Sequence, residues 1–166
     1  MRITGIILLI TLLSFIIAFA YAIHNKGINN SSPSYSITLP YLLQEDMQFT
    51  TNNLKGKPYI IHVFASWCTT CKEEHKIWLE IAEKNIIDIY GISYLDIKQN
   101  AIAWLQDNGN PYKVVAADYN GSSGHAFGIT GVPETFVFDK NGKIILHISG
   151  NITLEIWNNQ ILALLK

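Results

Sequence analysis

The chain contains 166 residues, of which 49% are hydrophobic, and it carries a formal net charge of −1 at pH 7. A chain of this length accommodates one domain of ordinary size together with a short appendage. A nearly neutral chain without a basic stripe lacks the electrostatic footprint of nucleic-acid binding, so we expect no nucleic-acid partner.

The N-terminal segment at residues 3–23 contains no charged side chain over 21 residues. About 20 apolar residues in a helix are enough to cross a bilayer, so the segment predicts a membrane anchor. Arg2 precedes it, and the positive-inside rule then places the following domain across the membrane from the cytoplasm. A cleaved signal segment is the alternative, because residues 18–20 (Ala-Phe-Ala) resemble a cleavage site. Both interpretations predict an exported domain.

Residues 24–36 are rich in Asn, Ser and Gly, a composition typical of a flexible linker, and the domain is expected at 37–166. A short strand or hairpin is predicted within residues 37–54, with Phe49 pointing inward. Residues 59–65 form a continuous apolar run, which predicts a strand buried on both faces. Helical spacing follows, with one apolar face made of Ile77, Trp78, Ile81 and Ala82.

The rest of the chain alternates strands and helices. Further strands are predicted at residues 86–93, 114–117, 135–138 and 143–148. A helix capped by Asp96 ends at Gly109, a short one lies near 125–127, and an amphipathic one spans 154–165. The core residues expected in that last helix are Ile156, Trp157, Ile161 and Leu164. This order predicts an α/β fold in which a mixed central sheet is flanked by helices on both faces.

Cys68 and Cys71 are the only cysteines, and they stand where the strand at 59–65 passes into a helix. Two thiols at this spacing can close and reopen a small disulfide, and a helix N-terminus favours the thiolate of the first. A C-x-x-C beside a strand–helix pattern is typical of a thioredoxin-like redox motif. We predict Cys68 as the attacking nucleophile and Cys71 as the resolving thiol. No cofactor is expected besides the redox-active disulfide itself.

Other uses of these cysteines are a static disulfide, a reduced core pair or a metal site. A two-residue spacer closes too small a loop to stabilise a fold much. Cys68, Cys71 and His75 supply three metal ligands, whereas a tetrahedral zinc site has four, so no metal is expected. Covalent haem attachment requires His directly after the second Cys, where Lys72 stands.

Pro133 is the next most informative residue, because it directly precedes a predicted strand and can hold a cis peptide bond there. Val132, before it, is expected to offer backbone groups to an extended substrate segment. Trp67, beside Cys68, is expected to contact the substrate as well. An ordinary loop proline is the alternative interpretation.

Two acids and one histidine could tune the thiols. Glu74 shares a helical face with Cys71, where it opposes thiolate formation or accepts the proton of Cys71 during resolution. A solvated helix acid is the alternative for Glu74. Glu134, next to Pro133, is the second acid. His62 lies in the predicted buried strand, as a satisfied core histidine or a proton relay. The remaining histidines are expected at the surface or in packing roles, and include His75, His125 and His147.

Three stretches resemble a known family: residues 65–75 (ASWCTTCKEEH), 101–112 (AIAWLQDNGNPY) and 128–136 (GITGVPETF). They are similar to the membrane-anchored thiol:disulfide interchange proteins of cytochrome c maturation, the CcmG or DsbE family of the thioredoxin superfamily. The resemblance covers residues 37–165 and implies a thioredoxin-like fold. Carried over by motif, it implies that Cys68 attacks, Cys71 resolves, Pro133 is a cis-proline, and Glu74 and Glu134 lie near the site.

The resemblance also implies a function and partners. Proteins of this family keep the Cys-x-x-Cys-His cysteines of apocytochrome c reduced, directly or through a thiol partner, and a membrane electron donor of the DsbD or CcdA type reduces them again. The expected location is the bacterial inner (cytoplasmic) membrane, with a single pass and the catalytic domain facing the periplasm. Alternatives are a broader periplasmic thiol reductase, or a tethered binding module without turnover. Thr69 stands where the family commonly has proline, so the resemblance does not imply a redox potential.

Overall fold

The computed structural model describes residues 2–26 and 35–165, and the chain divides into two units, Met1–Pro33 and Ser34–Lys166. The first unit contains helix α1 (Arg2–Lys26). In the part of the chain that the structure describes, no helix combines the length and the apolarity needed to cross a membrane. The anchor predicted at residues 3–23 is therefore not seen in the structure. The predicted linker at 24–36 overlaps the end of α1 and otherwise lies largely outside the described residues.

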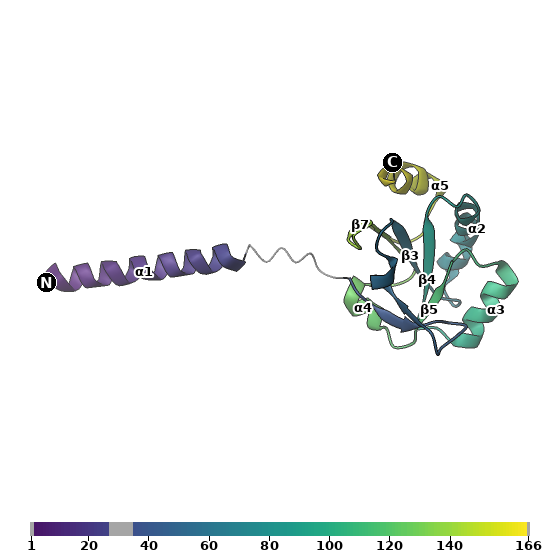
Figure 1. Ribbon diagram of the computed structural model, residues 1–166, viewed down its shortest axis with the longest axis horizontal. Helices are drawn as coiled ribbons and strands as arrows, with labels where there is room; N and C mark the ends of the chain where they lie inside the picture. The colour runs from purple at the N-terminus through teal and green to yellow at the C-terminus, as the bar shows by residue number, and fades with distance from the viewer. Residues whose placement is uncertain (1, 27–34, 166) are drawn as a thin grey trace. The chain divides into compact units, whose positions relative to one another are not determined.

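A five-stranded mixed sheet forms the centre of the second unit, in the spatial order β5–β4–β3–β6–β7 (Figure 1). Strand β3 runs parallel to β4, and β4 runs parallel to β5, whereas β6 is antiparallel to both β3 and β7. The strand bounds are Tyr59–Phe64 (β3), Asp88–Tyr94 (β4), Val115–Asp118 (β5), Glu134–Phe138 (β6) and Ile144–Ser149 (β7). The predicted mixed sheet is confirmed.

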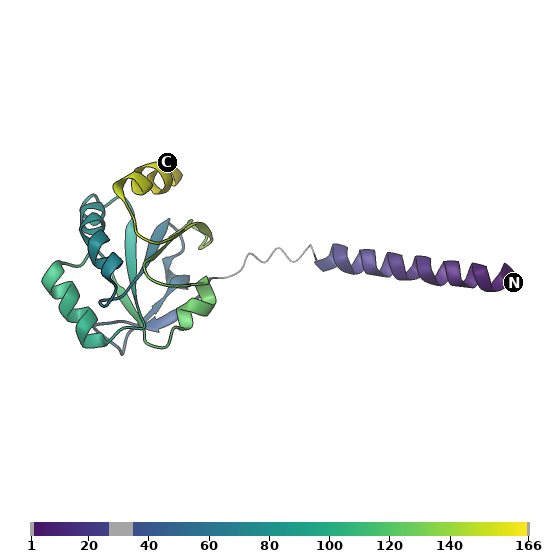
Figure 2. The ribbon, with the colours of Figure 1, turned by 180° about the vertical axis from the view of Figure 1, so that it is seen from behind.

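Helices cover both faces of this sheet. Figures 1 and 2 show α2 (Thr69–Glu83) and α3 (Lys98–Asn108) on one side of the sheet and α4 (Ser122–Phe127) on the other. The C-terminal helical segment packs in the same apolar cluster as α2 and α3, through Trp157 and Ile161. It comprises α5 (Leu154–Ile156), the π-helical turn η2 (Trp157–Ile161) and α6 (Leu162–Leu164).

Two apolar clusters, one on each face of the sheet, explain why β3 is apolar without alternation. Ile60 and Phe64 belong to the cluster under α2 and α3, whereas Ile61 and Val63 belong to the opposite cluster with α4. Every residue of β3 is buried, since successive side chains of a strand point to opposite faces. The central strand therefore has a core on both sides, and its carboxyl end delivers the cysteine motif.

A small antiparallel hairpin, β1 (Thr38–Pro40) with β2 (Gln48–Thr50), precedes the sheet and is followed by the short helix η1 (Thr51–Leu54). Phe49 of β2 is 3% exposed and belongs to the cluster on the α4 side, as predicted. The hairpin continues into a bridge between Tyr41 and Ala116 and a hydrogen bond from the Leu42 N–H to the Val115 carbonyl. These contacts cover part of the edge of β5.

Two apolar residues are exposed: Ile86, at the start of the strand predicted at 86–93, and Leu164, an expected core residue of the last helix. Ile86 is 49% exposed because Asn85, with φ of 48°, makes a turn there and β4 begins only at Asp88. Leu164 is 48% exposed because the C-terminal segment is not a regular α-helix. The π-helical turn at Trp157–Ile161 contains more residues per turn, and this shifts the buried face of the residues that follow.

Candidate active site

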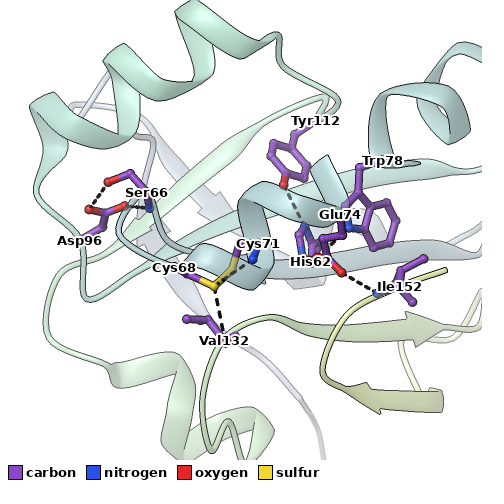
Figure 3. Close-up of a disulfide and its surroundings, with 10 residues drawn as sticks. All are labelled: His62, Ser66, Cys68, Cys71, Glu74, Trp78, Asp96, Tyr112, Val132 and Ile152. Atoms are coloured by element: carbon purple, nitrogen blue, oxygen red, sulfur yellow. Dashed lines mark hydrogen bonds and ion pairs between the residues drawn. A yellow bond between two sulfur atoms is a disulfide. The ribbon is translucent and has the colours of Figure 1, made fainter. Parts of the chain in front are cut away.

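The junction between β3 and α2 carries the two cysteines, which form a disulfide (Figure 3). Cys68 is the N-cap residue of α2, and its Sγ accepts a hydrogen bond of 3.1 Å from the backbone N–H of Cys71. Cys68 is 5% exposed and Cys71 is 1% exposed, so Cys68 is the more accessible residue of the pair. This is the arrangement that the predicted roles of nucleophile and resolving thiol require.

Asp96 holds the turn that presents Cys68, a role that the sequence did not reveal. Its carboxylate accepts hydrogen bonds from the backbone N–H and the hydroxyl of Ser66. The N-cap of α3 is Ile97 and has no side-chain cap, so the prediction of Asp96 as a helix cap is wrong. The carboxylate instead lies between two loops, where it also accepts from the Ile97 N–H at 2.7 Å. Ser66, two residues before Cys68, is thereby fixed.

Trp67 is the exposed side chain of the site, with 59% of its surface accessible. Its indole Nε1–H donates to the Leu95 carbonyl at 3.1 Å, which fixes the ring beside Cys68. Leu95 and Ile97 are also large apolar side chains exposed in this loop, at 49% and 62%. The position of Trp67 agrees with its predicted contact with substrate, which stays a prediction.

The loop before β6 lies against the disulfide, and its Val132–Pro133 peptide bond is cis, as predicted. The Val132 carbonyl oxygen is 3.6 Å from Sγ of Cys68, and Pro133 is buried. In the dithiol form a Cys68 S–H can donate to that carbonyl. Residues separated by 64 positions in sequence thus meet at one sulfur atom.

Glu134 is fully buried and holds this loop in place through hydrogen bonds from Thr130 and Gly131. One carboxylate oxygen accepts from the backbone N–H and hydroxyl of Thr130 and from the Gly131 N–H, and the other contacts His147 Nε2 at 2.8 Å. Burial opposes ionisation, but these hydrogen bonds outweigh it and hold the pKa of Glu134 below its usual value of 4.5. The structure therefore gives Glu134 a loop-bracing position, and a direct influence on the thiols stays a prediction.

Replacing Glu134 with glutamine is expected to lower the free energy of unfolding by about 1–2 kcal/mol at pH 7, because an amide cannot accept at both ends. The folded-state pKa is lowered, so the ionised carboxylate stabilises the fold above pH 4.5, and this contribution is lost as the pH falls through the folded value. The difference from the natural protein should therefore shrink on acidification, as measured by urea unfolding. Glu155→Gln, at an exposed position, serves as the control. A pH-independent difference would contradict this expectation.

Glu74 lies beneath the disulfide, three residues after Cys71, and is 2% exposed, so the alternative of a solvated acid is wrong. Its Oε1 accepts from the Trp78 indole at 3.1 Å and lies 2.8 Å from His62 Nε2. Its Oε2 accepts from the Ile152 backbone N–H. Figure 3 shows these groups converging on Glu74 from α2, from β3 and from the segment before α5.

His62 and His75 are both buried in packing positions. His62 is 1% exposed, stacks on Trp78 with ring centroids 4.6 Å apart, and pairs through Nδ1 with the Tyr112 hydroxyl at 2.8 Å. His75 packs against Trp104 with centroids 4.4 Å apart, and its Nε2 lies 3.0 Å from the Gly109 carbonyl. Burial lowers the pKa of His75, which favours its neutral form.

The structure thus brings together the predicted residues Trp67, Cys68, Cys71, Val132 and Pro133, with Glu74 beneath them. Sequence reasoning missed Asp96 as the brace of the turn, and it missed Tyr112 as the partner of His62. Tyr112 belongs to the Asn-Pro-Tyr motif at residues 110–112, which indicates the family but not a contact with His62. No local pattern pairs residues 50 positions apart.

Comparison with known proteins identifies the family. The chain matches the redoxin family over residues 29–159. It is 39% identical over 124 residues to the thiol:disulfide interchange protein DsbE of Pasteurella multocida, covering 75% of this chain and 68% of that protein. It is 36% identical over 132 residues to the DsbE of Pseudomonas aeruginosa, covering 80% and 73%.

Solved structures show the same fold. A putative DsbE from Chlorobium tepidum superposes with a TM-score of 0.69 at 22% identity, covering 81% of this chain and 96% of that one. A structure described as MTB dsbF in mixed oxidized and reduced forms superposes with a TM-score of 0.70 at 23% identity, covering 80% and 97%. With the Cys68–Cys71 disulfide, the family identifies a protein-disulfide oxidoreductase. The chain belongs to the redoxin family and, within the thioredoxin superfamily, is a thiol:disulfide interchange protein of the DsbE (CcmG) type.

Proposed function

We propose that this protein is a membrane-anchored, extracytoplasmic reductant of the Cys-x-x-Cys-His cysteines of apocytochrome c, acting directly or through a thiol partner in cytochrome c biogenesis. The observation that carries the proposal is the Cys68–Cys71 disulfide at the start of α2, against the cis Val132–Pro133 bond, in a chain of the DsbE type. The residue stretches at 101–112 and 128–136 support the narrower assignment to cytochrome c maturation.

The reaction follows from the two sulfurs. In the reduced protein the Cys68 thiolate attacks a substrate disulfide, one substrate sulfur leaves, and a mixed disulfide forms at Cys68. Cys71 then loses its proton, attacks Cys68 Sγ, and displaces the second substrate sulfur. Two electrons pass to the substrate, and Cys68 and Cys71 end as the disulfide. A membrane electron donor of the DsbD or CcdA type would return the two electrons.

The environment of the disulfide supports these roles. The N–H of Cys71 points at Cys68 Sγ and favours negative charge there, as does the start of α2. The Val132 carbonyl beside that sulfur offers an acceptor to an extended substrate backbone. Glu74, one turn after Cys71, is the buried acid on the same helical face and would accept its proton.

Attachment to the inner membrane, with the domain in the periplasm, is supported by the sequence of the first unit. Residues 3–23 contain no charge, and Arg2 precedes them. Apolar side chains of α1 such as Phe15 and Phe19 are exposed within that unit, at 73% and 62%. Apolar surface of this kind is stabilised by burial in lipid.

Trapping with Cys71→Ser in the native envelope tests the proposal. Without the resolving thiol, the mixed disulfide at Cys68 is expected to persist, and mass spectrometry should identify apocytochrome c or a maturation thiol protein as its partner. The double variant Cys68→Ser, Cys71→Ser is the matched control and should trap nothing. Recovery of the adduct in the washed membrane fraction would support the anchor.

Two results would favour the alternatives. Adducts with many unrelated envelope proteins would overturn the narrow assignment in favour of a broader periplasmic thiol reductase. If no covalent adduct forms although the partners co-purify, the protein would be a tethered binding module without turnover.

A further inference from the structure

Three large apolar side chains lie on the surface beside the cysteine motif: Trp67, Leu95 and Ile97, with exposed fractions of 59%, 49% and 62%. All three adjoin one hydrogen-bonded junction, which joins the Ser66 backbone N–H to the Asp96 carboxylate. Trp67 follows Ser66 in sequence, and Leu95 and Ile97 flank Asp96. We call these three residues the apolar shelf.

The loop between β4 and α3 has the reverse of the usual polarity. Its charged side chain, Asp96, is 9% exposed, whereas the apolar residues on either side of it lie at the surface. The burial of Asp96 is explained by its hydrogen bonds from Ser66 and from the Ile97 N–H. No such contact explains the exposure of its neighbours. Apolar groups gathered at the surface are typical of an interaction site.

Leu95 is unsuited to its backbone conformation. Its φ is 48°, in the left-handed region, where asparagine is favoured and a bulky side chain is strained. Hydrogen bonds hold the conformation on both sides of the residue. The Leu95 N–H donates to the Asp118 carbonyl, and the Leu95 carbonyl accepts from the Trp67 indole at 3.1 Å. The backbone alone would favour glycine or asparagine at this position.

Ile97 breaks a second local rule. It is the N-cap residue of α3, where Ser, Thr, Asp or Asn is preferred because its side chain accepts from a free N–H of the first turn. Ile97 makes no such bond. Local rules are broken mainly where function requires it. Leu95 and Ile97 therefore indicate a requirement for the apolar side chains themselves.

The chemistry at Cys68 determines what can reach the apolar shelf. A mixed disulfide holds the substrate sulfur about 2 Å from the sulfur of Cys68. Successive residues of a chain are only about 3.8 Å apart, so the neighbours of the substrate cysteine lie against the residues around Cys68. The Val132 carbonyl lies on one side of that sulfur, and Figure 3 shows Ser66 and Asp96 on another. The shelf is therefore within reach of a side chain that flanks the substrate cysteine.

The charges nearest to the apolar shelf are already paired. Asp96 accepts from Ser66, and Lys98, directly after Ile97, pairs with Glu45 at 3.1 Å. These pairs compete with any acidic or basic side chain of a substrate. The shelf therefore fits an uncharged, apolar group better than a charged one.

We propose that the apolar shelf is a specificity site, which binds a large aliphatic or aromatic side chain next to the substrate cysteine that Cys68 attacks. The proposal rests on the role proposed for Cys68 as nucleophile. It deepens that role by naming the class of substrate, namely disulfides whose cysteine has an apolar neighbour in sequence. Burial of that neighbour against Leu95 and Ile97 stabilises the complex in which the disulfides exchange.

The test measures how fast the dithiol form of the full chain reacts with two activated peptides. Each peptide has a single cysteine joined to an aromatic thiol, and that cysteine is flanked by leucine in one peptide and by glutamine in the other. The Cys68 thiolate attacks the peptide sulfur, a disulfide forms between Cys68 and the peptide, and the coloured aromatic thiolate leaves with the electron pair. We expect the natural protein to prefer the leucine peptide by about tenfold in second-order rate constant, near the lower end of what a hydrophobic contact discriminates.

The double variant Leu95→Asn, Ile97→Ser removes most of the shelf with residues that suit the backbone better. Asparagine tolerates a positive φ, and serine can cap α3. The double variant should therefore unfold at an equal or higher urea concentration than the natural protein, yet lose most of the preference for the leucine peptide. Each single variant should lose part of it, and supplies the test if the double variant does not fold.

Ile86→Gln is the matched control. Ile86 is 49% exposed, as Leu95 is, but it lies before the start of β4, whereas Leu95 follows the end of that strand. The control removes an exposed apolar side chain of the same size far along β4 from Cys68. It should retain the preference for the leucine peptide in full.

The proposal is overturned if the natural protein reacts with both peptides at the same rate, or if the double variant keeps the full preference. It is also overturned if Ile86→Gln loses the preference as the double variant does. A double variant that changes only the oligomeric state would assign the shelf to contacts between copies of the chain, against the proposal.

Failure of the proposed redox role gives a different result. The natural protein would then release coloured thiolate no faster than Cys68→Ser with either peptide. That result refutes the role of Cys68 itself, and the specificity site falls with it. Equal rates with the two peptides, both well above those of Cys68→Ser, refute the specificity site alone.

Discussion

Replacing Cys68 with serine is expected to lower turnover of a disulfide substrate about 1,000-fold or more, because loss of the attacking group removes the covalent step. Cys71→Ser is expected to stop turnover as well, but after the first attack. The difference arises from position, since Cys68 caps α2 and is the more exposed residue, whereas Cys71 lies one turn inside. Single-turnover reaction with an oxidised Cys-x-x-Cys-His peptide, followed by mass spectrometry, should show an adduct only with Cys71→Ser.

Thr69→Ser is a suitable control for this pair, because it changes an exposed side chain within the motif without touching either sulfur. It should form and resolve the adduct in the same order as the natural protein. If Cys68→Ser accumulated an adduct and Cys71→Ser did not, the roles of the two cysteines would be reversed. Cys71 would then have to become exposed to the substrate in solution.

Replacing Glu74 with alanine is expected to lower the free energy of unfolding by about 3 kcal/mol or more, since each buried donor left without a partner costs about 1–3 kcal/mol. The stranded donors are the indole N–H of Trp78 and the backbone N–H of Ile152, and the contact with His62 is lost as well. Urea unfolding of the natural protein and of Glu74→Ala at neutral pH measures the difference in the free energy of unfolding, provided that each protein unfolds in a two-state transition.

The neighbouring residue provides the control for this measurement. Glu73 is exposed on the same helical turn, so Glu73→Ala should change the free energy of unfolding by no more than about 0.5 kcal/mol. Similar small effects for Glu73→Ala and Glu74→Ala would mean that the carboxylate of Glu74 does not hold α2 to the segment before α5. The link between the active-site helix and the C-terminus would then depend on apolar packing alone.

Much of the architecture could be predicted because it depends on local pattern. The uninterrupted apolar run before Cys68 predicted a strand buried on both faces, and β3 does have a core on each side. The position of Pro133 just before a strand predicted the cis bond. The C-terminal helix was predicted with the wrong phase at Leu164, because a π-helical turn is set by how the segment packs rather than by residue spacing.

The acids show where sequence patterns stop being informative. Asp96 has the position of a helix cap, yet its carboxylate binds Ser66, 30 residues earlier. Glu134 adjoins Pro133 in sequence, but its hydrogen bonds run to Thr130, Gly131 and His147. Each carboxylate is satisfied by the donors that folding brings near it, and no periodicity encodes those donors.

The thiol chemistry of this protein is encoded locally, by two cysteines at a strand–helix junction, because thiol exchange needs only a short spacing and a helix start. The groups that surround these cysteines are brought there by the packing of distant segments. Tyr112, His62 and Glu74 come from three distant parts of the chain, and the contacts of His62 with the other two exist only once those parts pack on one another. Spacing along the chain governs local geometry, whereas the burial and pairing of charged groups are properties of the packed core.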